Sequence, residues 1–180
     1  MSSKSQKKEE SRKKIMAAAA ALFRKKGYHS TGVDAVMSKA GLTAGAFYAH
    51  YHSKSHLLEE ILKETLHKNF ETLLMGFENK KGEDFVQSVF KRYLSEVHRD
   101  YPEKGCPIAA LGTELTRESK RMSKIINKYV EDWVEIMNPH LDGDAKENRR
   151  AILTLLSMGL GAIILSRLTD GDISDDFLKI

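Results

Sequence analysis

The sequence contains little of what marks a secreted, disulfide-stabilised or β-rich protein. It has one cysteine, Cys106, which cannot form an internal disulfide, and its first residues include lysine and serine where a secretory signal needs an apolar stretch. We therefore expect a cytoplasmic protein. Three prolines in 180 residues, with no sustained apolar–polar alternation, favour helices over strands. The longest uncharged run, residues 151–166, contains two glycines and is short for a bilayer span, so no membrane role is expected.

Charge of both signs is present but is unevenly distributed. The formal net charge is +4, yet residues 1–60 carry 11 basic and 5 acidic side chains, and the rest of the chain has a small negative excess. Concentrated positive charge favours a polyanionic partner. With 41% hydrophobic residues and long stretches rich in Ala, Leu, Lys and Glu, the chain is expected to be globular and all-α.

The first ten residues are polar beyond Met1 and are expected to be flexible. A helix is predicted from Ser11, with apolar residues at three- and four-residue spacing on one face. This helix is expected to end at Gly27, which can adopt the left-handed conformation.

Two short helices and a long one are predicted next. Thr31 is expected to begin the second helix, with Asp34 completing a variant of the capping box, and Gly41 allows a sharp turn after it. Thr43 is expected to cap the third helix, and Ser53 the long fourth helix. Two short helices joined by a glycine-containing turn predict a helix-turn-helix.

The remaining helices are predicted from apolar stripes over residues 85–97, 108–115, 125–137 and 145–168, with a loop over residues 79–83. The sequence thus predicts an N-terminal three-helix bundle with a helix-turn-helix, over residues 1–53. A helical effector-binding and dimerisation bundle is predicted over residues 54–180.

The segment after Gly41 has residue types that suit a helix in the major groove of DNA, and Phe47 within it can face the core. Small residues that let the backbone approach DNA begin the helix: Thr43, Ala44 and Gly45. Side chains that can reach phosphates or base edges follow: Tyr48, His50 and Lys54. A packing corner in an ordinary helical bundle, with surface aromatics, is the alternative interpretation.

Residues 12–62 resemble the N-terminal domain of TetR-family repressors, from Ile15 through Gly27 and Gly41 to Leu58. The most specific part is AGLTAGAFYAHYHSKSHLL. The resemblance implies a regulator, most commonly a repressor, that binds a near-palindromic operator in double-stranded DNA as a homodimer, and activation stays open. Ala46 and Tyr51 differ from the commonest residues at their positions, which leaves base preference open. The expected DNA-contacting residues are Thr31, Thr43, Ala44, Gly45, Ala46, Tyr48, His50 and Lys54.

The apolar run 151–166 and the surroundings of Trp133 carry more apolar surface than the periphery of a monomer needs, which favours a dimer. A core helix within one subunit is the alternative. The resemblance favours the dimer, because this family pairs through its last two long helices. The expected interface residues are Tyr129, Trp133, Leu155, Met158, Ala162 and Leu165.

The resemblance also implies a small-molecule effector, expected to be partly apolar, that binds between the middle helices. The fourth helix would contact both domains and transmit binding. The expected pocket residues are Phe70, Leu74, Phe77, Phe85, Val89, Tyr93, His98, Cys106, Leu111 and Trp133. Helical spacing alone would make most of them ordinary core residues.

Cys106 allows two interpretations. A buried cysteine is most often a small hydrophobic residue. Alternatively, its place just before a helix predicted at residue 108 would lower the pKa of its thiol, so that the effector is an oxidant or an electrophile.

Other chemistry finds little support in the sequence. His52 and His56 could share a helical face, but no Cys, Asp or Glu at suitable spacing completes a metal site. Gly159 and Gly161 do not form a nucleotide-binding loop, since a third glycine and a preceding strand are missing. We therefore expect no cofactor and no enzymatic activity. An all-α enzyme without a DNA role and a structural helical adaptor are the rival classes.

Overall fold

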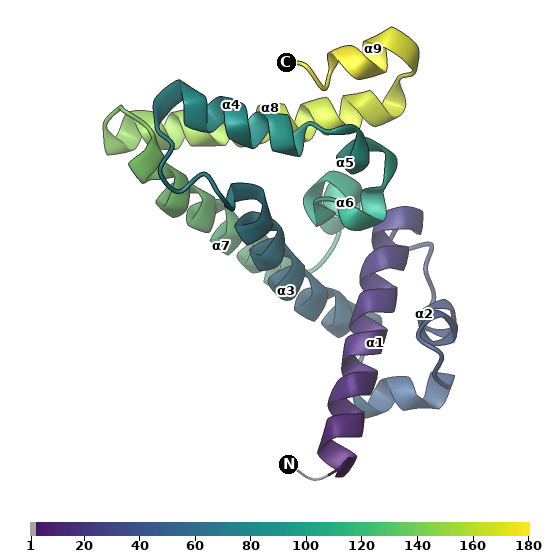
Figure 1. The fold of residues 1–180 in the computed structure, drawn as a ribbon. Helices are drawn as coiled ribbons and strands as arrows, with labels where there is room; N and C mark the ends of the chain where they lie inside the picture. The colour runs from purple at the N-terminus through teal and green to yellow at the C-terminus, as the bar shows by residue number, and fades with distance from the viewer. Residues whose placement is uncertain (1–2) are drawn as a thin grey trace.

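The structure is a computed structural model that describes residues 3–180, and every regular element within that range is a helix (Figure 1). The all-α prediction is confirmed. The first elements are α1 (Ser3–Lys26), α2 (Val33–Lys39), the 3-10 helix η1 (Ala44–Ala49) and α3 (Lys54–Leu74). The next are α4 (Gly82–Tyr93), α5 (Glu96–Asp100), the 3-10 turn η2 (Pro102–Lys104) and α6 (Pro107–Leu115). The last are α7 (Lys120–Met137), the 3-10 turn η3 (Asn138–His140), α8 (Ala145–Leu168) and α9 (Gly171–Asp176).

The N-terminal helix is longer than the sequence predicted. α1 begins at Ser3 instead of Ser11, so most of the segment expected to be flexible is helical, while residues 1 and 2 lie outside the described range. Its end agrees with the prediction: α1 stops at Lys26, and Gly27 has φ +89°, a conformation that L side chains rarely adopt.

The predicted cap of the second helix is wrong. α2 begins at Val33 with Gly32 as N-cap and without a side-chain cap, because the Thr31 hydroxyl donates instead to the carbonyl oxygen of Gly27 at 2.7 Å. Thr43 is the N-cap of η1, but its side chain makes no capping hydrogen bond. The Ser53 cap of α3 is confirmed, since its hydroxyl accepts a hydrogen bond from the His56 amide at 3.0 Å.

The helix predicted over residues 85–97 is two helices. α4 begins at Gly82, inside the predicted loop, and ends at Tyr93, and Ser95 then caps the short α5. α7 begins at Lys120, before the predicted start. The bounds predicted for the final long helix are confirmed in α8, whose start is fixed by a reciprocal capping box between Asp144 and Glu147. α9 follows it and was not predicted.

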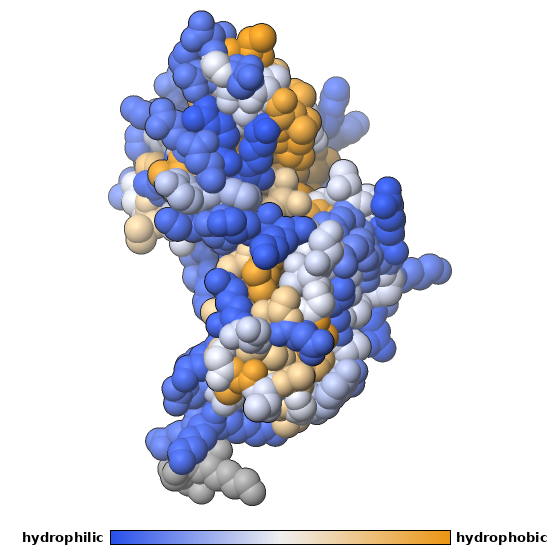
Figure 2. Space-filling model, turned by 90° about the vertical axis from the view of Figure 1, so that its right-hand side faces the viewer, coloured by the Kyte–Doolittle hydropathy of each residue, from blue (hydrophilic) through white to orange (hydrophobic). Residues whose placement is uncertain are grey.

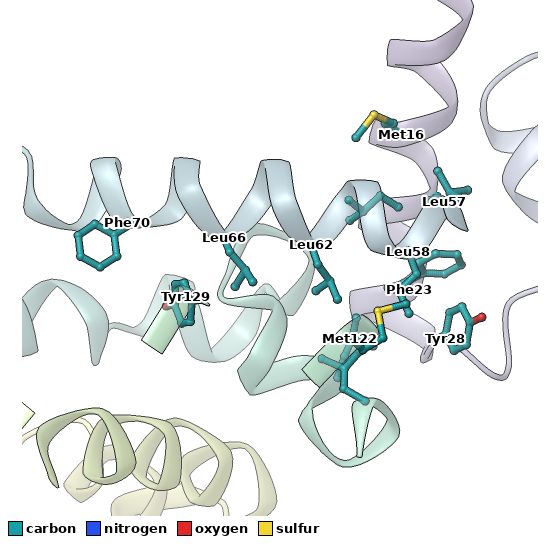
Figure 3. Close-up of a cluster of buried hydrophobic side chains, with 14 of the residues drawn as sticks. Met16, Phe23, Tyr28, Leu57, Leu58, Leu62, Leu66, Phe70, Met122 and Tyr129 are labelled. Atoms are coloured by element: carbon teal, nitrogen blue, oxygen red, sulfur yellow. The ribbon is translucent and has the colours of Figure 1, made fainter. Parts of the chain in front are cut away.

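The larger of two hydrophobic core clusters runs through the length of the molecule, and α3 connects its two ends. Leu57 and Leu58, at the start of α3, are buried against α1, whereas Phe70 lies beside Tyr129 of α7 (Figure 3). Figure 1 shows α3 crossing diagonally from the part that holds α1 and α2 to the part that holds α4, α7 and α8. The division between residues 53 and 54 stays a prediction, because the core is continuous across it.

α8 is long and apolar enough to span a membrane by length and composition alone, a test that core helices of soluble proteins also pass. Only 28% of its most apolar 18-residue window is buried within the chain. Figure 2 views the face to the right of Figure 1, where hydrophobic residues (orange) form separate groups among hydrophilic ones (blue). Half of the residues of α8 are exposed on the single chain.

Candidate nucleic-acid interface and cavities

α2 and η1 form a helix-turn-helix whose turn is made by Gly41. Gly41 has φ +68°, and the Leu42 amide donates to the carbonyl oxygen of Met37 at 3.0 Å, which closes the turn. Phe47 is fully buried and fixes η1 against the core. Its ring contacts Tyr51, with 5.7 Å between centroids. The opposite side of η1 is left facing solvent.

Most of the residues predicted to contact DNA lie on that outer side. Thr43, Ala44 and Gly45 are exposed, and Tyr48 is 72% exposed. An exposed tyrosine with a free hydroxyl can contact a phosphate or a base edge. The small residues before it leave the start of η1 open, since an added Cβ at Gly45 would meet nothing within 4 Å.

Two further predicted contact residues, Ala46 and His50, are half-buried beside the exposed ones. Burial lowers the pKa of His50, and the positive charges of Lys8 and Arg12 lower it further. Both effects favour the neutral imidazole. Thr31 does not belong to this outer surface: it is 2% exposed, because its hydroxyl is turned inward to Gly27.

Lys54, predicted to contact phosphate, is held within the chain. Its ammonium donates to the carbonyl oxygens of Tyr28 at 3.0 Å and Thr31 at 3.1 Å, and lies 4.3 Å from the centroid of the Tyr28 ring. An ammonium has three donors, so one remains for a phosphate. Lys54 thereby joins the start of α3 to residues 27–31, which we call the 27–31 turn.

The same turn is held from its other side by α6, a contact that sequence reasoning missed. The Glu114 carboxylate accepts hydrogen bonds from the backbone amides of Tyr28 at 3.1 Å and His29 at 2.7 Å. A side chain at Gly27 would come within 2.9 Å of this carboxylate. The turn before the helix-turn-helix is therefore fixed between α3 and α6.

A cavity of about 360 Å³ lies among α3, α4, α5, α7 and the turn before α6. Half of the predicted pocket residues line it: Phe70, Tyr93, His98, Cys106 and Trp133. The sequence analysis missed other lining residues, among them Asn69, Arg92, Lys104, Gly105 and Tyr129. The cavity includes the break between α4 and α5 in its wall. The sequence analysis predicted one continuous helix over residues 85–97 and therefore did not show this break.

The other predicted pocket residues lie elsewhere. Leu74, Phe77 and Phe85 line a separate hollow of about 490 Å³, whereas Val89 borders a void of about 20 Å³. Leu111 is 1% exposed and belongs to the main core. A further groove of about 700 Å³ between α3 and α7 shares Phe70 and Tyr129 with the first cavity. The rings of these two residues meet edge to face, 6.4 Å apart.

Gly105 lies in the cavity wall and is also bonded to the N-terminal part of the chain. Its carbonyl oxygen accepts hydrogen bonds from Asn69 of α3 at 3.2 Å and Arg24 of α1 at 3.4 Å. A Cβ at this position would overlap the ring of His98. The turn that closes the cavity is therefore in direct contact with α1.

The interpretation of Cys106 as a reactive thiol does not agree with its surroundings. Cys106 is 7% exposed, and burial raises the pKa of its thiol, although it precedes α6. His98 donates from Nδ1 to the carbonyl oxygen of Tyr93 at 2.8 Å and accepts the Cys106 amide at Nε2, at 3.0 Å. Burial lowers the pKa of His98 to about 4, so the ring is neutral and does not activate the thiol.

The histidines near η1 pack against each other. The rings of His52 and His56 stack with centroids 3.8 Å apart, and no group of three potential ligands occurs among the residues that the structure describes.

The predicted dimer-interface residues divide into two sets. Met158 and Leu165 are 42% and 43% exposed on α8, and Leu155 is half-buried. Tyr129, Trp133 and Ala162 are buried within the subunit, at 8%, 6% and 3%. The outer face of α8 also exposes Ile164 and Leu168, while an added Cβ at Gly161 would meet only open space.

Together, the buried anchor of η1, its open outer side and the basic N-terminal segment define a helix-turn-helix DNA-binding protein. The family "Bacterial regulatory proteins, tetR family" matches residues 15–61. Residues 15–61 thus carry a TetR-type DNA-binding domain, and the chain is similar to HTH-type transcriptional regulators.

Similarities to known proteins extend over most of the chain. The HTH-type transcriptional regulator YxaF of Bacillus subtilis is 28% identical over 157 residues, which are 84% of this chain and 81% of YxaF. A TetR regulator of Chloroflexus aurantiacus has the same fold, with a TM-score of 0.76, 24% identity and coverage of 97% and 93%. FadR of Bacillus subtilis, solved with stearoyl-CoA, gives a TM-score of 0.66, 18% identity and coverage of 92% and 95%.

Proposed function

We propose that this protein is a ligand-responsive repressor that binds a near-palindromic operator as a homodimer and is released by a small molecule. The observation that carries the proposal is the position of Gly105, which lines the cavity and whose carbonyl oxygen bonds to Arg24 of α1. A ligand that displaces this turn acts directly on α1. It shifts the population away from the DNA-binding form if it binds the displaced form more tightly.

Two helices connect the cavity to the 27–31 turn. α3 carries Phe70 in the cavity wall and Lys54 at the turn, and α6 follows the cavity residue Cys106 and carries Glu114 at the turn. The fourth helix of the sequence analysis is α3. We therefore infer that ligand binding is transmitted to the helix-turn-helix through α6 as well as through α3. Because the turn immediately precedes α2, its displacement reorients the helix-turn-helix.

DNA binding by η1 is tested with a DNA fragment from upstream of the protein's own gene, in a fluorescence anisotropy titration at several salt concentrations. Tyr48→Ala is expected to lower operator affinity about tenfold, in line with about 1–3 kcal/mol for a specific contact. Tyr101→Ala is the matched control, because Tyr101 is 48% exposed but lies after α5. Equal affinity of the two variants would refute the proposed role of η1.

Pairing through α8 is supported by its apolar and largely exposed outer face. Leu165→Lys is expected to convert the dimer into a monomer in size-exclusion chromatography with light scattering, because a charge would be buried at the interface. Ile173→Lys is the control, since Ile173 is 62% exposed on α9. A wild-type protein that is monomeric at micromolar concentration would refute the dimer.

A further inference from the structure

The first turns of α1 extend beyond the packed part of the molecule. Residues 5–10 are all exposed, whereas Ser11 and Arg12 are half-buried and Ile15 is fully buried. We call residues 5–10 the overhang. At 1.5 Å per residue, roughly 9 Å of helix stands free of the core. Figure 1 shows α1 starting at the end of the molecule away from α4 and α8 and running toward α6.

The overhang continues the face of α1 that is buried further along the helix. Lys8 precedes Arg12 by four residues and Ile15 by seven, so the three lie on one face. From Ile15 onward this face packs on the core, and at Lys8 the same face projects past the core.

This face of the overhang is directed to the end of η1. His50 directly follows η1, and its pKa is lowered by burial and further by the positive charges of Lys8 and Arg12. The overhang is therefore continuous with the surface of η1 that we propose to contact DNA.

Two lysines of the overhang, Lys7 and Lys8, carry charge that is not offset within the chain. The glutamates of the overhang are engaged along the helix, with carboxylate oxygens 2.8 Å from the Lys14 ammonium and 3.5 Å from the Arg12 guanidinium. Among the residues that the structure describes, no ion pair includes Lys7 or Lys8. Both ammonium groups are therefore available to an external anion.

The two positive charges do not stabilise the helix that carries them. A helix N-terminus is the positive end of the helix dipole, and the first turn of α1 contains no acidic residue. Lys8 and Arg12 are like charges four residues apart, an arrangement that destabilises a helix. Positive charge that opposes helix formation and has no partner within the chain favours a polyanion as its partner.

We propose that Lys7 and Lys8 bind phosphates of the DNA backbone beside the groove that η1 enters. This inference rests on the proposed binding of DNA by η1. It adds a contact outside residues 15–61, the segment that matches the TetR family. Phosphate contacts position a protein on the duplex without reading its sequence, so the overhang adds affinity for every sequence and leaves selectivity to η1.

The test compares Lys7→Gln/Lys8→Gln with the wild type, since Gln removes the charge and has nearly the helix propensity of Lys. Binding is measured by fluorescence anisotropy at several salt concentrations, on the fragment from upstream of the gene and on a scrambled duplex of the same length. Each phosphate contact contributes about 0.9 to the slope of log affinity against log salt, so the slope is expected to fall by about 1.8 per subunit. At low salt, affinity is expected to fall by about tenfold or more on both duplexes.

Lys25→Gln/Lys26→Gln is the matched control. Lys25 and Lys26 are exposed and follow Lys7 and Lys8 by 18 residues, so they lie on the same faces at the opposite end of α1. The control removes the same net charge and is expected to keep the wild-type slope. Lys7→Arg/Lys8→Arg is also expected to keep it, because Arg binds phosphate as well. An unchanged slope in Lys7→Gln/Lys8→Gln, or an equal fall in the control, would overturn the proposal.

Tyr48→Ala separates this inference from the proposed function. Suppose that Lys7→Gln/Lys8→Gln keeps the wild-type slope while Tyr48→Ala weakens binding to the upstream fragment. That result would refute the contact of the overhang and support the role of η1. A reduced slope in the lysine variant, with Tyr48→Ala equal to the wild type on both duplexes, would instead refute the role of η1 and support the phosphate contact.

Discussion

The clearest quantitative test concerns Glu114, which fixes the 27–31 turn from α6. Its carboxylate accepts two backbone amides, at 3.1 Å from Tyr28 and 2.7 Å from His29. Hydrogen bonds to charged groups contribute about 1.5–3 kcal/mol each. Glu114 is half-buried, so solvent screening reduces this contribution. Because Gln keeps one carbonyl acceptor, we expect Glu114→Gln to lower the free energy of unfolding by about 1–2 kcal/mol.

The measurement is urea unfolding at fixed protein concentration, followed by circular dichroism. For a chain of this size, the expected loss lowers the melting temperature by about 2–8 °C. A second readout is local: the Tyr28 and His29 amides are expected to exchange with deuterium faster in the variant.

Glu118→Gln is the matched control. Glu118 comes one turn after Glu114, and its carboxylate lies 3.6 Å from His29 Nε2, whereas the backbone amides of the turn bond to Glu114. We expect a smaller loss for this variant, because Gln keeps the volume of the side chain and no backbone hydrogen bond is removed. If Glu114→Gln unfolds as Glu118→Gln does and both amides keep their exchange rates, the proposed connection between α6 and the turn is incorrect.

Three further predictions concern other parts of the chain. Folding lowers the pKa of His98 from 6.5 to about 4, so the unfolded state binds the proton more readily and stability falls as pH drops from about 6.5 to 4. The loss of stability reaches about 2 kcal/mol at pH 5. Urea unfolding at several pH values should show a smaller loss in His98→Gln than in the wild type, and equal losses would contradict the role of His98. Because burial raises the pKa of Cys106, its native thiol should react with a disulfide reagent at least tenfold more slowly than after unfolding, and equal rates would refute this. Asp144→Ala removes the capping box of α8 and should lower the free energy of unfolding by about 1 kcal/mol. Asp172→Ala, at an exposed position, should change it little, and equal melting temperatures of the two variants would refute the stabilising role of the capping box.

Local patterns predicted the helices and the exposed outer side of η1. The helix-turn-helix was predicted from the spacing of apolar residues and from the positions of Gly27 and Gly41. Both signals are local, because a helix end at a left-handed residue and a buried helix face depend on residues close together in the sequence. The bounds of α8 were predicted for the same reason.

The features that sequence reasoning missed depend on contacts between distant residues. Glu114 bonds to amides 85 and 86 residues away, so no local pattern reveals its partner. Lys54 was interpreted as free to contact phosphate, yet it bonds to carbonyls of the 27–31 turn. One of the two interpretations of Cys106 was a thiol pKa lowered by its place before a helix, whereas burial by the surrounding helices raises that pKa. In each case tertiary packing outweighed the local effect.

The close packing of Gly159 against Tyr93 has a consequence for a paired molecule. A Cβ at Gly159 would lie 3.4 Å from the Tyr93 ring, so α8 rests directly on a side chain that also borders the cavity. If two chains associate through α8 as proposed, a ligand that moves this ring also moves the helix shared with the second chain. The two sites of the pair would then not fill independently, and saturation curves should depart from simple hyperbolic binding.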